Sequence, residues 1–389
     1  GYDPSVLDGA GNRIGDPTGQ THSVLFFDYD NDLDPDLWVA NDGDAFHIYR
    51  NDSTKSSLKF TEMNESMGLS LVGAWMGFAI GDYDGDLDLD LFVPNIGYHP
   101  TTRPPVRNPT GSCEYHHQFE WGSCLHFLLR NNQDASEYSF TDIASSIVIL
   151  PSAIMPPDSL DSNNIHRAFQ IPHGLEAYEF GFGTTFFDFD NDGNQDLYWL
   201  GSTAGRGGGP GGEGYPSAGR LLRGNGKGTF KDVTVESRLL DIKGVRYHLM
   251  GQNKAPISMR MDSKFHENGK GLAHGDFNGD GYVDLVGTNS SGPLYNNFPL
   301  DPFDIRMESA PPFLWYNGGG NNNWVSLRLQ GRMAIGQDGS NADGIGSRVI
   351  VTSNIEGSTE ELKQVQEVRA GSSYLSMDSV ELEFGLGSS

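Results

Sequence analysis

The sequence predicts an all-β protein, a β-propeller of about seven blades followed by a small β-rich domain. Three observations predict this fold class. An aspartate-rich phrase of ten residues occurs four times, and each copy runs into a short apolar segment. A second phrase, which reads as strand, polar turn and strand, follows each of the first three copies. Short aromatic and β-branched runs alternate with glycine-rich turns, and no long stretch shows helical periodicity.

The aspartate-rich phrase has the pattern D-x-[DN]-x-D-x-x-x-D-L, with an aromatic residue in second place. Its copies begin at Asp28, Asp82, Asp188 and Asp276, and we call them loops 1 to 4. In a plain strand the alternate carboxylates would lie about 7 Å apart on one face and repel one another. A calcium ion removes this repulsion, because it takes about six to eight oxygen ligands in a flexible geometry. The alternative is a solvated acidic turn, which does not require the fixed aspartate at position 9.

The odd positions of each loop supply the predicted ligands, with a backbone carbonyl at position 7, so we expect about four Ca²⁺ ions. These residues are Asp28, Asp30, Asp32, Asp34 and Asp36; Asp82, Asp84, Asp86, Asp88 and Asp90; Asp188, Asp190, Asp192, Asn194 and Asp196; and Asp276, Asn278, Asp280, Tyr282 and Asp284. An EF-hand closes with Glu at position 12. Here a leucine and a strand follow position 9, which indicates a loop-then-strand site.

Position 6 differs between the loops. It is Gly193 and Gly281 in loops 3 and 4, but Leu33 and Leu87 in loops 1 and 2. Glycine adopts positive φ without steric cost and leucine does not. We therefore expect loops 1 and 2 to bend differently or to bind more weakly, with the additional carboxylate at position 7 offsetting the loss.

The second phrase covers Ile48–Met63, Leu128–Ile143 and Leu221–Val233, and we interpret Pro293–Asn297 as a degenerate fourth copy. The long gaps between loops hold insertions or blades that lack the aspartate phrase. We place the propeller at residues 1–315, with an insertion at 99–127 and a glycine-rich loop at 201–219. The remaining residues, 316–389, form the β-rich domain.

The formal charge of −26 comes mainly from the loops, because seventeen acidic side chains lie in them and the rest of the chain carries −9. Nucleic acid is excluded as a partner, since phosphate binding needs a basic surface. No run of 18 apolar residues is present, so no membrane insertion is expected. The chain begins at Gly1 without a signal peptide, which fits a mature or trimmed start.

Several features favour an extracellular protein, secreted or on the cell surface. Cys113 and Cys124 flank a polar loop, and we expect a disulfide between them, with two free thiols as the alternative. Weak calcium loops fill at the millimolar calcium found outside cells. Sequons at Asn51, Asn64 and Asn289 permit glycosylation.

The four loops resemble the FG-GAP/VCBS repeats of integrin α-subunit propellers and of many exported bacterial proteins. The segment Asn321–Gly387 resembles the ASPIC/UnbV domain through Trp324, the run Gly344–Val349, Gly371 with Tyr374-Leu375-Ser376, and Phe384–Gly387. The ordered pair resembles the cartilage acidic protein family and its bacterial relatives. The resemblance implies an exported calcium-binding propeller with roles in adhesion, and no established catalytic residues.

Three functions follow as expectations. The first is a non-enzymatic protein for adhesion or for surface or filament assembly, with other proteins or copies of itself as partners. The second is a calcium-dependent lectin, and the third is a propeller-scaffold hydrolase or lyase. ASPIC/UnbV domains usually continue past the Phe384–Gly387 phrase, so a missing last strand would leave an open sheet edge that another copy completes as a fibre.

Overall fold

A computed structural model gives the structure of the chain. It describes residues 20–45, 47–69, 72–95, 126–134, 137–150, 175, 181–205, 214–216, 219–239, 269–290, 292–297, 301–308, 311–354 and 361–388. The expected all-β class is confirmed: apart from strands, the longest regular element of these residues is the short 3₁₀ helix η5 (Arg332–Ile335). No helix among the described residues is long and apolar enough to cross a membrane.

Four sheets, antiparallel except for one strand of sheet 3, each contain one aspartate loop as the turn between two adjacent antiparallel strands. Sheet 1 consists of β1 (Gln20–Phe27), β2 (Asp36–Ala45), β3 (His47–Asn51), β4 (Phe60–Glu62) and β5 (Val72–Ala74). Sheet 2 consists of β6 (Ala79–Gly81), β7 (Asp90–Val93), β8 (Phe127–Asp134) and β9 (Glu137–Asp142). Sheet 3 consists of β11 (Thr184–Phe187), β12 (Asp196–Leu200), β15 (Gly219–Gly224), β16 (Thr229–Asp232) and the parallel strand β10 (Val148–Leu150). Sheet 4 consists of β17 (Gly269–Gly275), β18 (Asp284–Asn289) and β21 (Phe313–Trp315).

The strand register is the same around every loop. The residue before position 1 pairs with the aspartate at position 9 in each sheet, as Phe27↔Asp36, Gly81↔Asp90, Phe187↔Asp196 and Gly275↔Asp284. The second phrase forms the third and fourth strands of sheets 1 to 3, as predicted.

The fourth copy of the second phrase is not Pro293–Asn297. That segment lies in β19 (Gly292–Asn297), which pairs with β20 (Asp301–Glu308) in a separate hairpin. The third strand of sheet 4 is β21 instead, and β21 lies at the edge of its sheet as the structure describes it. A similar hairpin of β13 (Thr203–Gly205) and β14 (Gly214–Pro216) closes the base of the glycine-rich loop.

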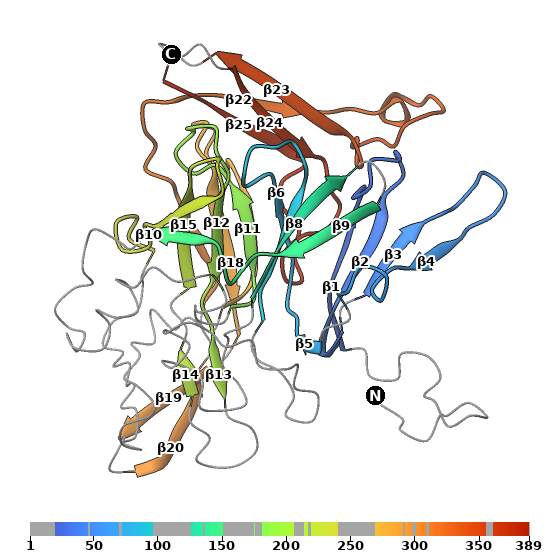
Figure 1. The fold of residues 1–389 in the computed structure, drawn as a ribbon. Helices are drawn as coiled ribbons and strands as arrows, with labels where there is room; N and C mark the ends of the chain where they lie inside the picture. The colour runs from blue at the N-terminus through green and yellow to red at the C-terminus, as the bar shows by residue number, and fades with distance from the viewer. Residues whose placement is uncertain are drawn as a thin grey trace, which may run out of the picture.

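The four sheets pack face to face around a common centre, in a propeller-like arrangement (Figure 1). Trp38 of sheet 1 shares a buried core with Leu91 of sheet 2, and Phe92 on the opposite face of β7 shares another with Trp199 of sheet 3. Leu200 of sheet 3 packs with Leu285 of sheet 4. The described residues therefore form four blade-like sheets, each in contact with the next. The expected number of about seven blades stays a prediction, because long segments between the sheets lie outside the described residues.

The C-terminal domain is a pair of two-stranded sheets that lies across one end of the propeller (Figure 1). Its strands are β22 (Asn323–Arg328) with β25 (Glu381–Gly387), and β23 (Arg348–Asn354) with β24 (Glu361–Glu367). Val368, Leu382 and Phe384 form its buried core.

The segment Gly371–Ser379, between β24 and β25, enters the centre of the propeller. It hydrogen-bonds to every sheet: Ser23 Oγ to Ser373 O at 2.5 Å, Ser373 N to Phe78 O at 2.8 Å, Thr184 N to Ser373 Oγ at 2.9 Å, Ser376 Oγ to Leu272 O at 2.7 Å, and Ser379 N to His274 O at 3.0 Å. Tyr374 also makes edge contacts with the rings of His22 and Phe182, at 5.4 and 5.0 Å between centroids. The two domains are thus one interlocked body, with this segment filling the centre.

Candidate calcium loops and neighbouring surfaces

One hydrogen-bond network recurs in all four loops. The carboxylate at position 1 accepts the backbone N–H groups of positions 5 and 6, as Asp28 accepts Asp32 and Leu33 at 3.1 Å each. The same pairs in loops 2, 3 and 4 measure between 2.7 and 3.2 Å. The carboxylate at position 5 accepts the N–H of position 7 at 2.9 to 3.1 Å. These bonds curl each loop so that the side chains at positions 1, 3 and 5 point inward.

The expected difference in bending at position 6 is wrong. Leu33 and Leu87 have φ values of 77° and 73°, close to the 89° and 85° of Gly193 and Gly281. The network around position 1 imposes the left-handed conformation on leucine as well, although a side chain there costs about 1–2 kcal/mol. Loops 1 and 2 therefore carry backbone strain, and their geometry matches that of loops 3 and 4.

The clustered carboxylates fit a calcium ion. Single oxygens of Asp28, Asp30 and Asp32 lie within 4.8 Å of one another, as do those of Asp82, Asp84 and Asp86 and of Asp188, Asp190 and Asp196. At position 3 of loops 1 to 3 one buried oxygen, Oδ1, accepts no hydrogen bond. An unsatisfied buried carboxylate oxygen is costly, and a hard cation is its natural partner. Loop 4 has Asn278 at position 3 and exposes more of its ligands, so its site is the most open.

Burial, and to a smaller extent the charges of neighbouring carboxylates, raises the pKa values of these acids. Burial, followed by the charges of Asp32 and Asp28, raises the pKa of Asp30 to about 6. Burial raises the pKa of Asp82 to about 7 and, with Asp192, that of Asp188 to about 8. A bound cation would hold these groups ionised. In loop 3 the guanidinium of Arg223 provides part of that charge, at 2.7 Å from Asp190 and 2.8 Å from Asp192.

The aspartate at position 9 has a second role that the sequence did not reveal. Its Oδ2 accepts the N–H of the aromatic residue at position 2, and its Oδ1 accepts an N–H from the third strand of the sheet. The donors are Asn51, Asn131 and Gly224 of the third strand in sheets 1 to 3, and Asn317 just after the third strand in sheet 4, at 2.7 to 2.8 Å. The position 9 oxygen joins the ligand cluster only in loop 3 among the three clusters named above. This residue therefore ties loop to sheet, which explains why it is fixed in the pattern.

The C-terminal domain packs directly on the loops. Arg348 Nη2 donates to the carbonyl of Asp28 in loop 1 at 2.6 Å. Gly387 N donates to Asn191 O in loop 3 at 2.9 Å. A Cβ on Gly281 in loop 4 would lie 1.7 Å from the ring of Trp324. The ring of Trp324 therefore packs directly against the backbone of Gly281. Ordering of the loops and seating of the domain are therefore coupled.

The remaining predicted residues fall into two groups. Cys113 and Cys124, with most of the 99–127 insertion, lie outside the described residues. The three sequon asparagines lie in folded structure. Asn64 is buried and accepts the N–H of Ile48 at 2.7 Å, which leaves no room for a glycan. The side-chain amides of Asn51 and Asn289 are half-buried and donate to the carbonyls of Pro35 and Pro311.

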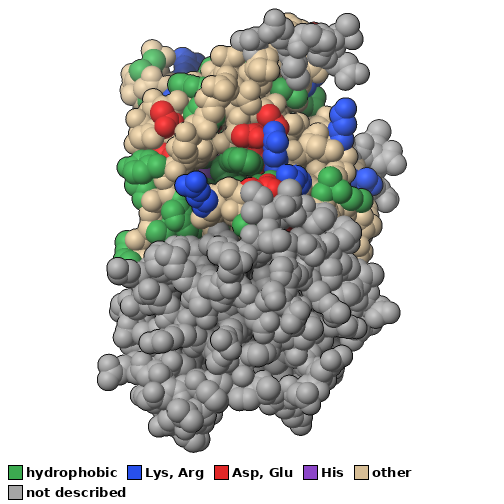
Figure 2. Space-filling view, turned by 90° about the vertical axis from the view of Figure 1, so that its left-hand side faces the viewer, with side chains coloured by type: hydrophobic (Ala, Val, Ile, Leu, Met, Phe, Trp, Pro, Cys, Tyr) green, Lys and Arg blue, Asp and Glu red, His purple; other side chains and the backbone are tan. Residues whose placement is uncertain are grey.

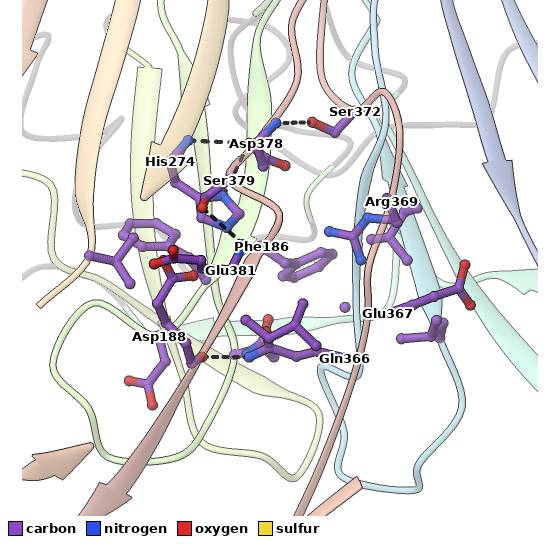
Figure 3. A pocket seen from close by; sticks show the side chains of 18 of the residues that line it. Phe186, Asp188, His274, Gln366, Glu367, Arg369, Ser372, Asp378, Ser379 and Glu381 are labelled. Carbon is purple, nitrogen blue, oxygen red and sulfur yellow. Dashed lines mark hydrogen bonds and ion pairs between the residues drawn. The ribbon is translucent and has the colours of Figure 1, made fainter. Parts of the chain in front are cut away.

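A buried ionic cluster lies where the C-terminal domain meets sheets 2, 3 and 4 (Figure 3). His274 Nδ1 lies 3.2 Å from Asp378 Oδ1, and Arg369 and Glu383 line the same cavity. Burial raises the pKa of Glu383 to about 7. The cavity holds only about 30 Å³, the space of one or two water molecules. It is too small for a substrate and belongs to the domain interface.

Two further hollows lie between sheets. An open groove of about 420 Å³ beside loop 2 is lined by Tyr83, Asp84, Arg130 and Lys227. A more apolar pocket of about 240 Å³ lies between sheets 3 and 4, with Phe189, Leu221, Leu239 and Trp315 among its walls.

Comparison with known families supports the architecture. Residues 28–93 match the FG-GAP-like repeat, and residues 337–389 match ASPIC and UnbV. No curated protein matches the chain. The first match spans loops 1 and 2 with strands β2 to β7, and the second covers most of the C-terminal domain. The chain therefore combines an FG-GAP-type β-propeller with a C-terminal ASPIC/UnbV domain.

Proposed function

We propose that this propeller protein is a non-enzymatic, calcium-stabilised extracellular protein that works through protein–protein contacts, in adhesion or in surface or filament assembly. The observation that carries the proposal is a pair of apolar sheet faces, one at each end of the row of four sheets. We call them the first and the last end face.

The first end face is the side of sheet 1 that points away from sheet 2. Its apolar residues are Val24, Phe26, Leu37, Val39, Tyr49 and Phe60, and the ion-paired His47 and Glu62 lie on the same face next to Val39 and Tyr49. Val24 and Phe26 are 42% and 40% exposed. A sheet with one solvated face normally alternates apolar and polar residues, whereas a sheet covered on both faces is apolar throughout. Strands β1 and β2, which pair Val24 with Val39 and Phe26 with Leu37, have the composition of strands that are covered on both faces.

The last end face is the side of sheet 4 that points away from sheet 3. Ala273, Val286 and Leu314 are cross-strand neighbours on it, and the ring of Phe277 in loop 4 is 51% exposed. The residues at equivalent repeat positions in sheets 1 to 3 pack against the next sheet, and at position 2 Tyr29 and Tyr83 are buried and Phe189 is partly buried.

The two end faces are complementary halves of the internal packing. In sheet 2, Ile80 and Leu91 occupy the repeat positions of Phe26 and Leu37, and both pack against sheet 1. The same packing between the last end face of one copy and the first end face of another would form a head-to-tail contact, which closes into a ring or propagates as a filament.

The edge of β25, which the sequence suggested as an assembly site, is partly occupied within the molecule. Gln364 Nε2 donates to Gly385 O and Gln366 Nε2 donates to Glu383 O, each at 2.6 Å. Side chains of β24 thus satisfy carbonyls that an added strand would use. We therefore favour the end faces over this edge for self-assembly.

Particle size tests the proposal. We expect light scattering in millimolar calcium to show assemblies for the parent protein and smaller particles for Phe26→Asp. Leu58→Asp, at an 82% exposed position in the β3–β4 hairpin of the same sheet, is the matched control and should assemble as the parent does. A parent protein that stays monomeric at all accessible concentrations would contradict self-assembly.

Calcium-dependent carbohydrate binding is a second candidate, favoured by the groove beside loop 2. That groove joins Tyr83, a polar ring with a hydrogen-bonding hydroxyl, to two cationic side chains and to a predicted calcium ligand, Asp84. A glycan screen in calcium, repeated with Lys227→Ala, would test it. A hydrolase or lyase has less support, because the raised-pKa acid Glu383 outside the loops lines a cavity of only about 30 Å³.

A further inference from the structure

The space beside β21 corresponds to a filled space in the other sheets. Asn131 in β8 donates its backbone N–H to Asp90 Oδ1 at 2.8 Å and its side chain to Tyr29 O at 3.2 Å. Asn317, which follows β21, makes the same two bonds, to Asp284 Oδ1 at 2.7 Å and to Phe189 O at 2.6 Å. β21 therefore occupies in sheet 4 the place that β8 occupies in sheet 2.

In sheets 2 and 3 a fourth strand covers this place and inserts a phenylalanine against the preceding loop. β9 pairs with β8 and brings Phe140 to 6.0 Å from the ring of Tyr29 in loop 1. β16 pairs with β15 and brings Phe230 to 6.0 Å from the ring of Tyr83 in loop 2. Both phenylalanines are buried, so each is part of the contact between two sheets.

Sheet 4 has no such strand among the described residues, because β21 is the edge of the sheet there. The aromatic residue of loop 3, Phe189, lines the apolar pocket of about 240 Å³ in place of a phenylalanine contact. Leu221, Leu239 and Trp315 form other walls. Among the described residues, the pocket is thus the counterpart of the two aromatic contacts in sheets 2 and 3, without a phenylalanine from a fourth strand.

We propose that the edge of β21 and this pocket bind an extended peptide segment of a partner protein. The segment adds as a fourth strand, with main-chain hydrogen bonds to β21 and a phenylalanine in the pocket. An acidic residue two positions after the phenylalanine completes the motif, as Asp142 follows Phe140 and Asp232 follows Phe230. In sheet 2 that acid accepts the N–H of Leu128 at 3.4 Å, and Leu314 holds the equivalent position in β21.

This inference rests on the proposed function, because it names one partner surface of a protein that works through protein contacts. It is separable from self-assembly, since the pocket lies between sheets 3 and 4 and not on either end face.

The test is binding of a fluorescent peptide with the sequence of residues 228–235 to the full-length protein in calcium. We expect saturable binding, which weakens about tenfold or more when the peptide phenylalanine is replaced by alanine. Leu239→Glu in the protein, which puts a charge into the apolar wall, should abolish binding. Leu150→Glu, at an exposed position on β10, is the matched control and should bind as the parent does. Tyr316→Ala, at the exposed rim, is a second variant that keeps the test valid if Leu239→Glu fails to fold.

Two results would overturn the inference. One is absence of peptide binding, which would mean that the pocket does not accept a strand or that another segment of the chain or a second copy already fills it. The other is binding that is indifferent to the peptide phenylalanine and to the pocket variants. Peptide binding by a protein that never self-associates would instead overturn self-assembly and leave this site standing.

Discussion

Substitution of Gly385 by alanine tests whether the C-terminal domain and loop 3 form one cooperative unit. Gly385 lies in β25, directly over loop 3. An added Cβ would lie 2.1 Å from Asp188 Oδ2 and 2.4 Å from the Cα of Asn191. Both distances are far shorter than an ordinary van der Waals contact, and one of the atoms is backbone, so the strand or the loop must move. Overpacking of this kind costs roughly 1–3 kcal/mol.

The assay is urea unfolding followed by tryptophan fluorescence, in saturating calcium and in chelator. We expect Gly385→Ala to lower the free energy of unfolding by about 1–3 kcal/mol and to weaken calcium binding by loop 3. Gly318→Ala is the control, since no atom lies within 4 Å of its added Cβ. It should stay within about 0.5 kcal/mol of the parent. Equal stability of the two variants would refute the close seating of β25 on loop 3.

Three further predictions concern the loops and the centre of the propeller. Chelation should lower the melting temperature in calorimetry, because each site adds about 2.7 kcal/mol at calcium one hundred times above its dissociation constant; an unchanged melting temperature would exclude structural calcium. In saturating calcium, Asp90→Ala should cost more stability in urea unfolding than Asp86→Ala, which removes an exposed ligand. Asp90→Ala leaves the buried N–H groups of Tyr83 and Asn131 without acceptors, at about 1–3 kcal/mol each; equal losses would assign Asp90 to metal binding alone. Burial lowers the pKa of Lys270 to about 7, so the unfolded chain binds its proton more tightly and the stability of the parent should rise between about pH 7 and pH 10.5. Below pH 7, the free energy of unfolding of Lys270→Met should therefore exceed that of the parent by the largest amount. Denaturation at several pH values measures this difference, and a difference that is constant with pH would contradict the burial of a charged amine.

The sequence by itself determined the local chemistry of this protein. The spacing of the aspartates specifies four loops of one shape, because alternate positions of a curled turn face a common centre. The same repeat indicated the strands on either side of each loop and the strand–turn–strand phrase that follows in sheets 1 to 3. These features depend on contacts within a few residues, which a pattern can express.

Only the tertiary structure decided how the repeats combine. The spacing predicts position 9 as a ligand, but it does not show that the oxygens of this residue also accept N–H groups, including one from a strand up to 41 residues away. The fourth copy of the second phrase was assigned to Pro293–Asn297, whereas β21 takes that place through pairing with β18. The central segment Gly371–Ser379 carried a recognisable pattern but no sign of its position. Hydrogen bonds to four separate sheets depend on long-range packing. The periodicity of a single segment does not predict such packing.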